Sequence, residues 1–165
     1  MKRFLLALAF ALPLFAHEAP SVTTVILVRH AEKIDDKANA DPELTDAGRA
    51  RATELARMLA SSGVQAIYVT PFHRTRQTGA PAAKALGLEA VEVKTGKTYA
   101  KDVAELIRKQ HAGSTVLVVG HSNSTQQVIQ ELGIAGAPFI PETDYDNFFV
   151  VTLVGDSATL LKLKY

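Results

Sequence analysis

The stretch 25–28 is the feature that most constrains the fold. It reads Val-Ile-Leu-Val, four branched apolar residues of which three are β-branched. Such a run is typical of a strand that is buried on both faces, as in the middle of an α/β sheet. The run ends abruptly at Arg29 and His30. Open α/β sheets bind their ligands at the carboxyl ends of strands, so we expect chemistry here, with His30 as a nucleophile or a base.

Strand and helix patterns alternate along the rest of the chain. Apolar residues at helical spacing predict helices at 45–62, 73–86, 100–111 and 125–132. Short apolar or alternating runs predict further strands at 66–69, 88–93 and 115–119, and a terminal hairpin from 148–154 and 158–163. The expected fold is a three-layer α/β/α sandwich with a mostly parallel central sheet and a C-terminal antiparallel hairpin.

Residues 1–16 are expected to lie outside the folded domain. Lys2 and Arg3 form a basic start, and the apolar run that follows ends at Ala16 before a polar segment. This is the plan of a secretory signal peptide, with cleavage after Ala16 or as late as about residue 19. The alternatives are a short amphiphilic anchor or an N-terminal strand. We therefore expect an exported protein, periplasmic or secreted, with residues 22–165 as a single domain and no membrane attachment after processing.

Composition excludes several classes of partner. The chain has no cysteine, which rules out lipoprotein anchoring and a disulfide framework. Without Lys2 and Arg3, 16 basic residues face 17 acidic ones, giving a formal charge of −1. This near-neutral balance does not favour a nucleic acid or an anionic membrane as a partner.

Two later strand ends carry polar chemistry that matches the first. Thr-Pro-Phe-His-Arg at 70–74 follows the second strand, and Gly-His-Ser-Asn-Ser at 120–124 follows the strand 115–119. The carboxyl ends of parallel strands meet at one edge of a sheet. Two arginines, two histidines and a helix N-terminus would therefore converge there. This set is suited to a tetrahedral dianion, because planar guanidinium groups match phosphate oxygens.

Each of these residues also has an ordinary explanation when taken alone. A strand end can be solvated, an arginine can form a surface ion pair, and Ser122 or Asn123 can be an N-cap. A metal site is the sharper alternative, with ligands from His30, Glu32 and His121. The neighbouring guanidinium groups would repel a divalent cation, so we expect neither a metal nor another cofactor.

Three motifs resemble those of the histidine phosphatase superfamily, also called phosphoglycerate-mutase-like. They are Arg-His-Ala-Glu at 29–32, Thr-Pro-Phe-His-Arg-Thr-Arg-Gln-Thr at 70–78 and Gly-His-Ser-Asn-Ser at 120–124. Their order and spacing match, and the resemblance covers about residues 22–165. Ala31 stands where the family signature has glycine, and Lys33 where many relatives have Ser or Thr.

The resemblance implies a metal-independent phosphatase. His30 would attack phosphorus and form a phosphohistidine that water hydrolyses. Arg29, Arg74 and His121 would hold the phosphoryl oxygens, with Ser122 as a further phosphate-binding residue. The expected substrate is a small phosphomonoester or a related phosphorylated compound, with phosphohistidine and a phosphopeptide among the candidates. A phosphoglycerate-mutase-type transferase and a non-catalytic phosphate- or phosphopeptide-binding module are the alternatives.

The general acid is the part of the catalytic set that the motifs do not identify. Family branches take it from an insertion after the third strand or from an aspartate directly after the second histidine. Here Ser122 follows His121, and the segment 89–98 is too short for a large insertion. Glu32 is the candidate on the same turn as His30, and the others are Glu92, Asp144 and Asp146. Short relatives that act on phosphohistidine lack the acid.

The substrate is not predicted by the walls of the expected site. These walls come from residues 34–43, 92–99 and 134–146, which contain no recognisable specificity pattern. Tyr145 could face the site or could pack at the entrance of the hairpin.

Overall fold

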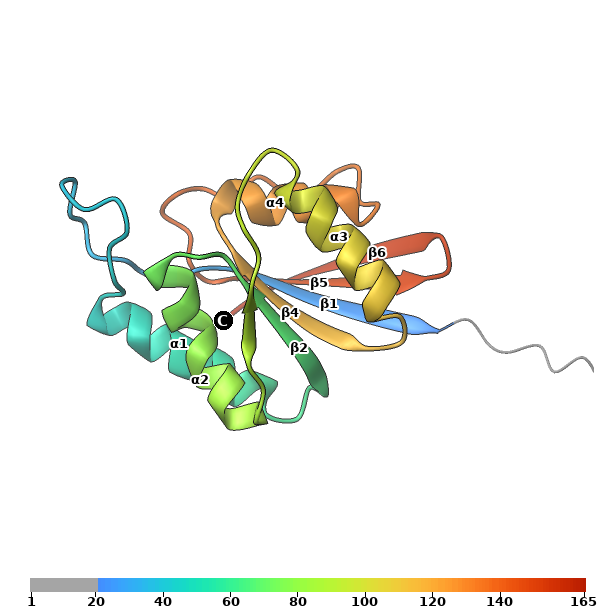
Figure 1. The fold of residues 1–165 in the computed structure, drawn as a ribbon, viewed down its shortest axis with the longest axis horizontal. Coiled ribbons are helices and arrows are strands. Elements are labelled where there is room, and N and C mark those ends of the chain that lie inside the picture. Colours follow the sequence, from blue (N-terminus) through green and yellow to red (C-terminus); the bar gives the residue numbers. More distant parts are fainter. Residues whose placement is uncertain (1–20) are drawn as a thin grey trace, which may run out of the picture.

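The computed structural model describes residues 21–165, so the predicted signal peptide lies outside the described residues. Within this part of the chain, strands and helices alternate before a closing hairpin (Figure 1). The elements are β1 (Val22–Arg29), α1 (Asp46–Leu59), β2 (Val64–Val69), α2 (His73–Leu86), β3 (Ala90–Glu92), α3 (Tyr99–Gln110), β4 (Thr115–Gly120), α4 (Ser122–Glu131), β5 (Asn147–Val154) and β6 (Ser157–Lys164).

The six strands form one sheet in the order β3-β2-β4-β1-β5-β6. Strands β1 to β4 run parallel, while β5 pairs antiparallel with β1 and β6 antiparallel with β5. The predicted three-layer α/β/α sandwich with a C-terminal antiparallel hairpin is therefore confirmed. The register aligns Arg29 with Gly120 and Val69 with Val119, so the carboxyl ends of β1, β2 and β4 lie level.

Alternate residues of β1 supply two separate cores. Val25 and Leu27 pack with the buried residues of α3 and α4, and Ile26 and Val28 pack with those of α1 and α2. Since successive side chains of a strand point to opposite faces, an uninterrupted apolar run is required where helices cover both faces. Full burial of each such side chain contributes roughly 1.5–3 kcal/mol, which keeps β1 fixed at the centre of the sheet.

Some element boundaries differ from the predictions. Helix α1 ends at Leu59, because the chain turns at residues 60–62 before Gly63 adopts a φ of 70°. Strand β3 is shorter than predicted, since it pairs only with Ile67–Val69 at the end of β2. Helix α4 begins earlier, at Ser122, so the N-cap is His121 rather than Ser122 or Asn123.

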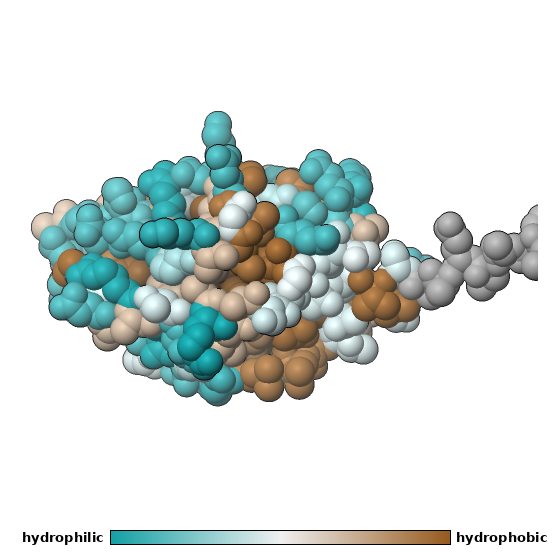
Figure 2. All heavy atoms as spheres, turned by 90° about the horizontal axis from the view of Figure 1, so that it is seen from below, coloured by the Kyte–Doolittle hydropathy of each residue, from teal (hydrophilic) through white to brown (hydrophobic). Residues whose placement is uncertain are grey.

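Polar and apolar surfaces are unevenly distributed over the molecule. Figure 2 shows mostly polar side chains at the end where the loop 34–43 lies, and apolar surface in the middle of this face. In residues 21–165, none of the helices has the length and apolar character that crossing a membrane requires.

Candidate active site

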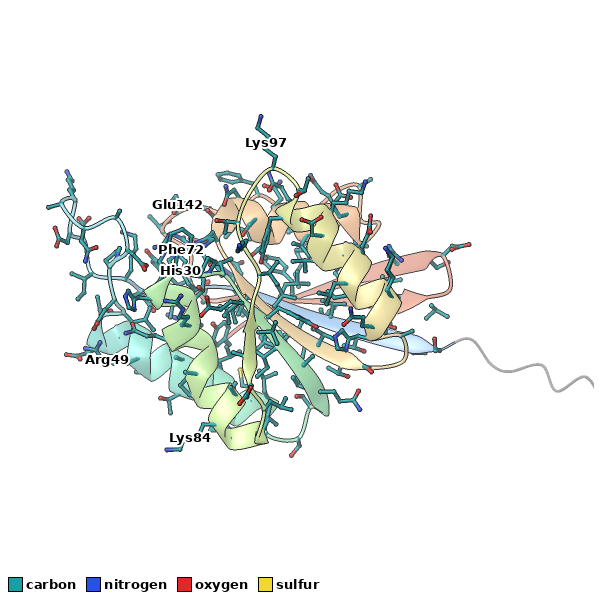
Figure 3. The ribbon with its side chains drawn as sticks, in the orientation of Figure 1. His30, Arg49, Phe72, Lys84, Lys97 and Glu142 are labelled. Atoms are coloured by element: carbon teal, nitrogen blue, oxygen red, sulfur yellow. The ribbon has the colours of Figure 1, made fainter. Side chains whose placement is uncertain are left out.

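An open cavity of about 570 Å³ lies at the carboxyl ends of β1, β2 and β4. The strand ends are tied together there, since the backbone N–H of His30 donates to the carbonyl of Gly120 over 2.9 Å. Figure 3 shows His30, Phe72 and Glu142 gathered at this end of the sheet, while Arg49 and Lys84 lie apart from them. The lining residues come from all three strand ends and from two of the predicted wall segments, 92–99 and 134–146, whereas the predicted wall 34–43 contributes none. They are His30, Lys33, Phe72, Arg74, Thr95, Gly96, Tyr99, His121, Ser122, Asn123, Ser124, Gln127 and Glu142.

His30 is held as a neutral imidazole with a defined tautomer. Its side chain is buried, and burial is the main reason that its pKa falls to about 3. The ring of His121 and the guanidinium groups of Arg29 and Arg74 lower this pKa further. Nδ1 of His30 lies 2.8 Å from the carbonyl oxygen of Ala31, so in the neutral ring it donates its proton there. Nε2 is left with the lone pair that a nucleophile needs.

Arg29 is almost wholly buried beside this ring, with 1% of its side chain exposed. Its Nη1 donates to the carbonyl of Pro141 over 3.0 Å, and its Nη2 donates to Oε2 of Glu142 over 2.6 Å. The guanidinium carbon lies 4.3 Å from the centre of the Tyr145 ring. The Tyr145 ring therefore packs against Arg29 without lining the cavity, and the irregular segment that contains these three partners wraps around the arginine.

Arg74 lines the cavity from the first turn of α2. Its guanidinium carbon lies 4.4 Å from the centre of the Phe72 ring, and its Nη1 is 3.4 Å from Oδ1 of Asp41. The Nε–H groups of Arg74 and of Arg29 are both buried and have no acceptor within the described residues. A buried N–H without an acceptor costs about 1–3 kcal/mol. Of the two arginines, Arg74 is the one that lines the cavity, and Arg29 lies behind the lining.

His121 approaches the same point from the end of β4. Its ring centre is 5.4 Å from that of His30 and 5.2 Å from that of Phe72. Burial, with the charges of Arg74 and Arg29, lowers the pKa of His121 to about 4. Its Nε2 shares a hydrogen bond of 2.9 Å with the hydroxyl of Thr70. Thr70 thus orients His121, a role that the sequence analysis missed although the residue opens the second motif.

Gly120 allows helix α4 to begin directly after β4. A Cβ at this position would lie 2.9 Å from the hydroxyl oxygens of Ser124 and Thr125. The Ser124 hydroxyl instead accepts a 2.9 Å hydrogen bond from the backbone N–H of His121. This close approach brings His121 and the N-terminus of α4 to the cavity wall.

Ser122 and Glu142 form a pair at the cavity that the sequence analysis did not anticipate. The Ser122 hydroxyl donates to Oε1 of Glu142, while Oε2 of Glu142 holds Arg29. Ser122 is therefore at the site, as expected, but its hydroxyl is already bound to a carboxylate. Glu142 lies in the irregular segment 134–146, where no periodicity or motif marked it.

Part of this arrangement matches a known family. Residues 25–96, which contain the first two motifs, match the family model of the histidine phosphatase superfamily, branch 1. The segment that carries His30 and Arg74 is therefore similar to that superfamily. No curated protein sequence matches the chain.

Solved structures share the fold of this chain at low sequence identity. A protein histidine phosphatase, SixA, in complex with tungstate is 21% identical, with a TM-score of 0.69 over 86% of this chain and 96% of its own. A mycobacterial glucosyl-3-phosphoglycerate phosphatase is 15% identical, with a TM-score of 0.64 over 87% of this chain and 98% of its own. YhfR of Bacillus stearothermophilus is 18% identical, with a TM-score of 0.67 over 84% of this chain and 95% of its own.

The structure does not bring Glu32 to the candidate active site. Both carboxylate oxygens of Glu32 accept from Nε of Arg51 over 3.0 Å, and Nη2 of Arg51 lies 2.7 Å from Oε1. The hydrogen bonds with Arg51 lower the pKa of Glu32, which is the wrong direction for a proton donor. The candidacy of Glu32 as general acid is therefore corrected: it is an ion-pair partner outside the cavity lining.

The other carboxylates considered as acids are also engaged elsewhere. Glu92 pairs with Arg76 over 2.6 Å, Asp146 with Lys164 over 2.6 Å, and Asp144 lies 3.7 Å from Lys164. None of the three lines the cavity. Within residues 21–165, no three His, Cys, Asp or Glu side chains are grouped to hold a metal ion, and the alternative set of His30, Glu32 and His121 is not assembled.

The Gln-Thr end of the second motif joins α2 to the loop after β1. Oε1 of Gln77 accepts from the backbone N–H of Leu44 over 2.8 Å. The Thr78 hydroxyl accepts from the N–H of Ala31 over 2.9 Å and donates to the carbonyl of Arg74 over 2.7 Å. Thr78 thus links the residue that fixes the His30 tautomer to the backbone of the second arginine.

Proposed function

We propose that this protein is a histidine phosphatase that hydrolyses a small phosphorylated substrate through a phosphohistidine on His30, without a metal. The observation that carries the proposal is a neutral, tautomer-fixed His30 beside arginine N–H groups that lack acceptors. A binding protein for phosphate would need the cationic groups, but it would not need a histidine with its lone pair kept free.

The geometry supports a two-step displacement. Nε2 of His30 forms a bond to phosphorus while the bond to the leaving oxygen breaks, and a water then attacks phosphorus and releases His30. Arg29, Arg74 and His121 surround the site of the transferred group and would stabilise its oxygens as charge redistributes. Because these groups are fixed before the substrate arrives, little reorganisation is needed in the transition state.

The test is to trap the intermediate. An aryl phosphate labelled on phosphorus is mixed with the protein in the presence of a chelator, and the reaction is stopped in alkaline detergent, under which a phosphoramidate survives. We expect label on His30 in the wild type. His30→Ala should lose the label and at least about 1,000-fold of the hydrolysis rate.

The outcomes separate catalysis from binding alone. Turnover by His30→Ala at the wild-type rate would contradict the proposal, and so would a wild type that binds phosphate but never becomes labelled. Loss of activity with the chelator, restored by added metal, would contradict the metal-independent part. Circular dichroism of both proteins checks that the substitution leaves the fold intact.

Phosphohistidine is a second candidate substrate, favoured by one observation at the site. Ser122 follows His121, so the aspartate that one family branch uses as an acid is missing there. A protonated imidazole is a good leaving group and needs no further proton. The SixA structure, which is that of a protein histidine phosphatase, has the same fold. Faster hydrolysis of a phosphohistidine peptide than of any phosphomonoester would favour this candidate.

Export is proposed from the sequence of residues 1–16. The basic start, the apolar run and the small residue before a polar segment support processing by a signal peptidase. Mass spectrometry of the protein recovered from the extracytoplasmic fraction should show an N-terminus between residues 17 and 20. Recovery of the full chain from the cytoplasm would contradict the proposal.

A further inference from the structure

Among residues 21–165, Glu142 is the only one that brings a carboxyl group to the lining of the cavity. Its carboxylate bridges Nη2 of Arg29 and the hydroxyl of Ser122. The side chain of Glu142 is 76% exposed, although the Arg29 side chain that it contacts is almost completely buried. Glu142 therefore lies at the mouth of the site, where it is exposed to solvent and is held by Arg29 and Ser122.

The geometry of displacement directs the leaving group toward this mouth. His30 is 3% exposed, so it forms the floor of the cavity and attacks phosphorus from inside. The leaving oxygen is roughly in line on the opposite side of phosphorus, which is the solvent side. Glu142 stands on that side, whereas Glu32 is held by Arg51 outside the lining.

A bound phosphoryl group would lie next to Glu142. Nη2 of Arg29 is held by the Glu142 carboxylate over 2.6 Å, so Arg29 would be shared between the phosphoryl oxygens and this side chain. The Glu142 carboxyl would then be within reach of the oxygen that leaves.

The other titratable lining groups are less suited to transfer a proton to this oxygen. Arg74 stays charged under all working conditions. Burial raises the pKa of the Tyr99 hydroxyl to about 12, so it gives up its proton poorly. Burial keeps His121 neutral near pH 7, so it has no extra proton to release. Lys33 is the one remaining rival, and it can be tested separately.

We propose that Glu142 is the general acid of this phosphatase, an inference that rests on the proposed function. Nε2 of His30 forms the bond to phosphorus, and the electron pair of the breaking P–O bond goes to the leaving oxygen. The Glu142 carboxyl transfers its proton to that oxygen. The resulting carboxylate then takes a proton from the water that attacks the phosphohistidine, which restores the starting state.

The test compares Glu142→Gln with the wild type on aryl phosphates of graded leaving-group basicity. Phenyl phosphate, whose leaving group needs a proton, should lose about 100-fold in kcat/KM, within the usual range for general acid catalysis. Dinitrophenyl phosphate, whose leaving group departs as an anion, should change only a few-fold. The dependence of rate on leaving-group basicity therefore becomes steeper.

Glu92→Gln is the matched control, since Glu92 is also paired with an arginine but does not line the cavity. It should leave all rates unchanged. Equal losses on every substrate, no loss, or a general gain from release of Arg29 would each overturn the assignment. A loss confined to phenyl phosphate in Lys33→Met, rather than in Glu142→Gln, would also overturn it.

Failure of this inference can be distinguished from failure of the proposed function. Glu142→Gln should still form the labelled phosphohistidine from dinitrophenyl phosphate, because the nucleophile and the anion-binding groups are intact. If Glu142→Gln becomes labelled but its rate loss does not depend on the leaving group, Glu142 is not the general acid, while His30 is still the nucleophile. A wild type without any label would reject the proposed function as well.

Discussion

Arg29 and Arg74 differ from an ordinary surface arginine in the hydrogen bonding of their Nε atoms. Arg76, two residues after Arg74, uses Nε to bind Glu92 over 2.6 Å. In Arg29 and Arg74 the Nε–H is buried and has no acceptor within the described residues. A lysine would keep the charge at such a position but would lose the fork of donors that matches a phosphoryl group.

We therefore predict that Arg74→Lys lowers kcat/KM for an aryl phosphate by about 100-fold, as expected when a donor that stabilises transition-state charge is lost. Arg76→Lys, which makes the same chemical change in an exposed ion pair, should alter kcat/KM less than about twofold. Steady-state kinetics of the two variants makes the comparison. Equal effects of the two substitutions would show that charge alone, rather than the position of the donor, determines activity.

Helix α1 is docked on the segment that follows β1. The carbonyl of Glu32 accepts from the backbone N–H of Thr45 over 2.9 Å, and the Thr45 hydroxyl caps the helix by accepting from the N–H of Gly48 over 3.1 Å. Position 48 requires glycine, because a Cβ there would clash with the carbonyl oxygen of Glu32. Ala31 is fully buried next to this contact, in a small apolar cluster with Leu44 and Ala52.

We predict that Gly48→Ala destabilises the protein although alanine favours helices. The gain in helix propensity is about 1 kcal/mol, while overpacking against backbone costs about 1–3 kcal/mol or more. The net loss in the free energy of unfolding, measured by urea denaturation, should reach up to about 2 kcal/mol. Gly136→Ala, where a Cβ meets nothing within 4 Å, should change it by less than about 1 kcal/mol. Equal stability of the two variants would exclude the contact as the reason for Gly48.

The whole molecule has to bury two neutral imidazoles to build the site. Burial lowers the pKa of His30 to about 3 and that of His121 to about 4, from an ordinary value of 6.5. At a pH between the lowered pKa values and the ordinary value of 6.5, the unfolded chain binds more protons than the folded one. The free energy of unfolding therefore rises with pH in this window and falls as the solution becomes more acidic.

We predict that the free energy of unfolding falls by about 2 kcal/mol from pH 6 to pH 5, since each ring contributes up to about 1.4 kcal/mol per pH unit. His121→Asn should remove about half of this dependence. Urea denaturation at several pH values, without phosphate in the buffer, provides the measurement. An unchanged pH dependence in the variant would show that His121 is not buried as the neutral form.

The sequence by itself determined the sheet and the place of the chemistry. Apolar runs such as 25–28 are buried on both faces wherever they lie in a compact chain, and strands joined by helices run parallel. Parallel strands bring their carboxyl ends to one edge, so Arg29, His30, Arg74 and His121 could be placed together from local pattern and order alone. The irregular course of residues 134–146 could not be predicted in this way.

Only the tertiary structure decided which carboxylates belong to the site. Glu32 is two residues from His30, yet it turns to Arg51 on α1, 19 residues further along the chain. Glu142 reaches Arg29 across 113 residues. Proximity in sequence does not set the direction of a side chain. A carboxylate binds the guanidinium that the packed fold brings within reach, and the segment that carries Glu142 has no periodic pattern from which that position could be read.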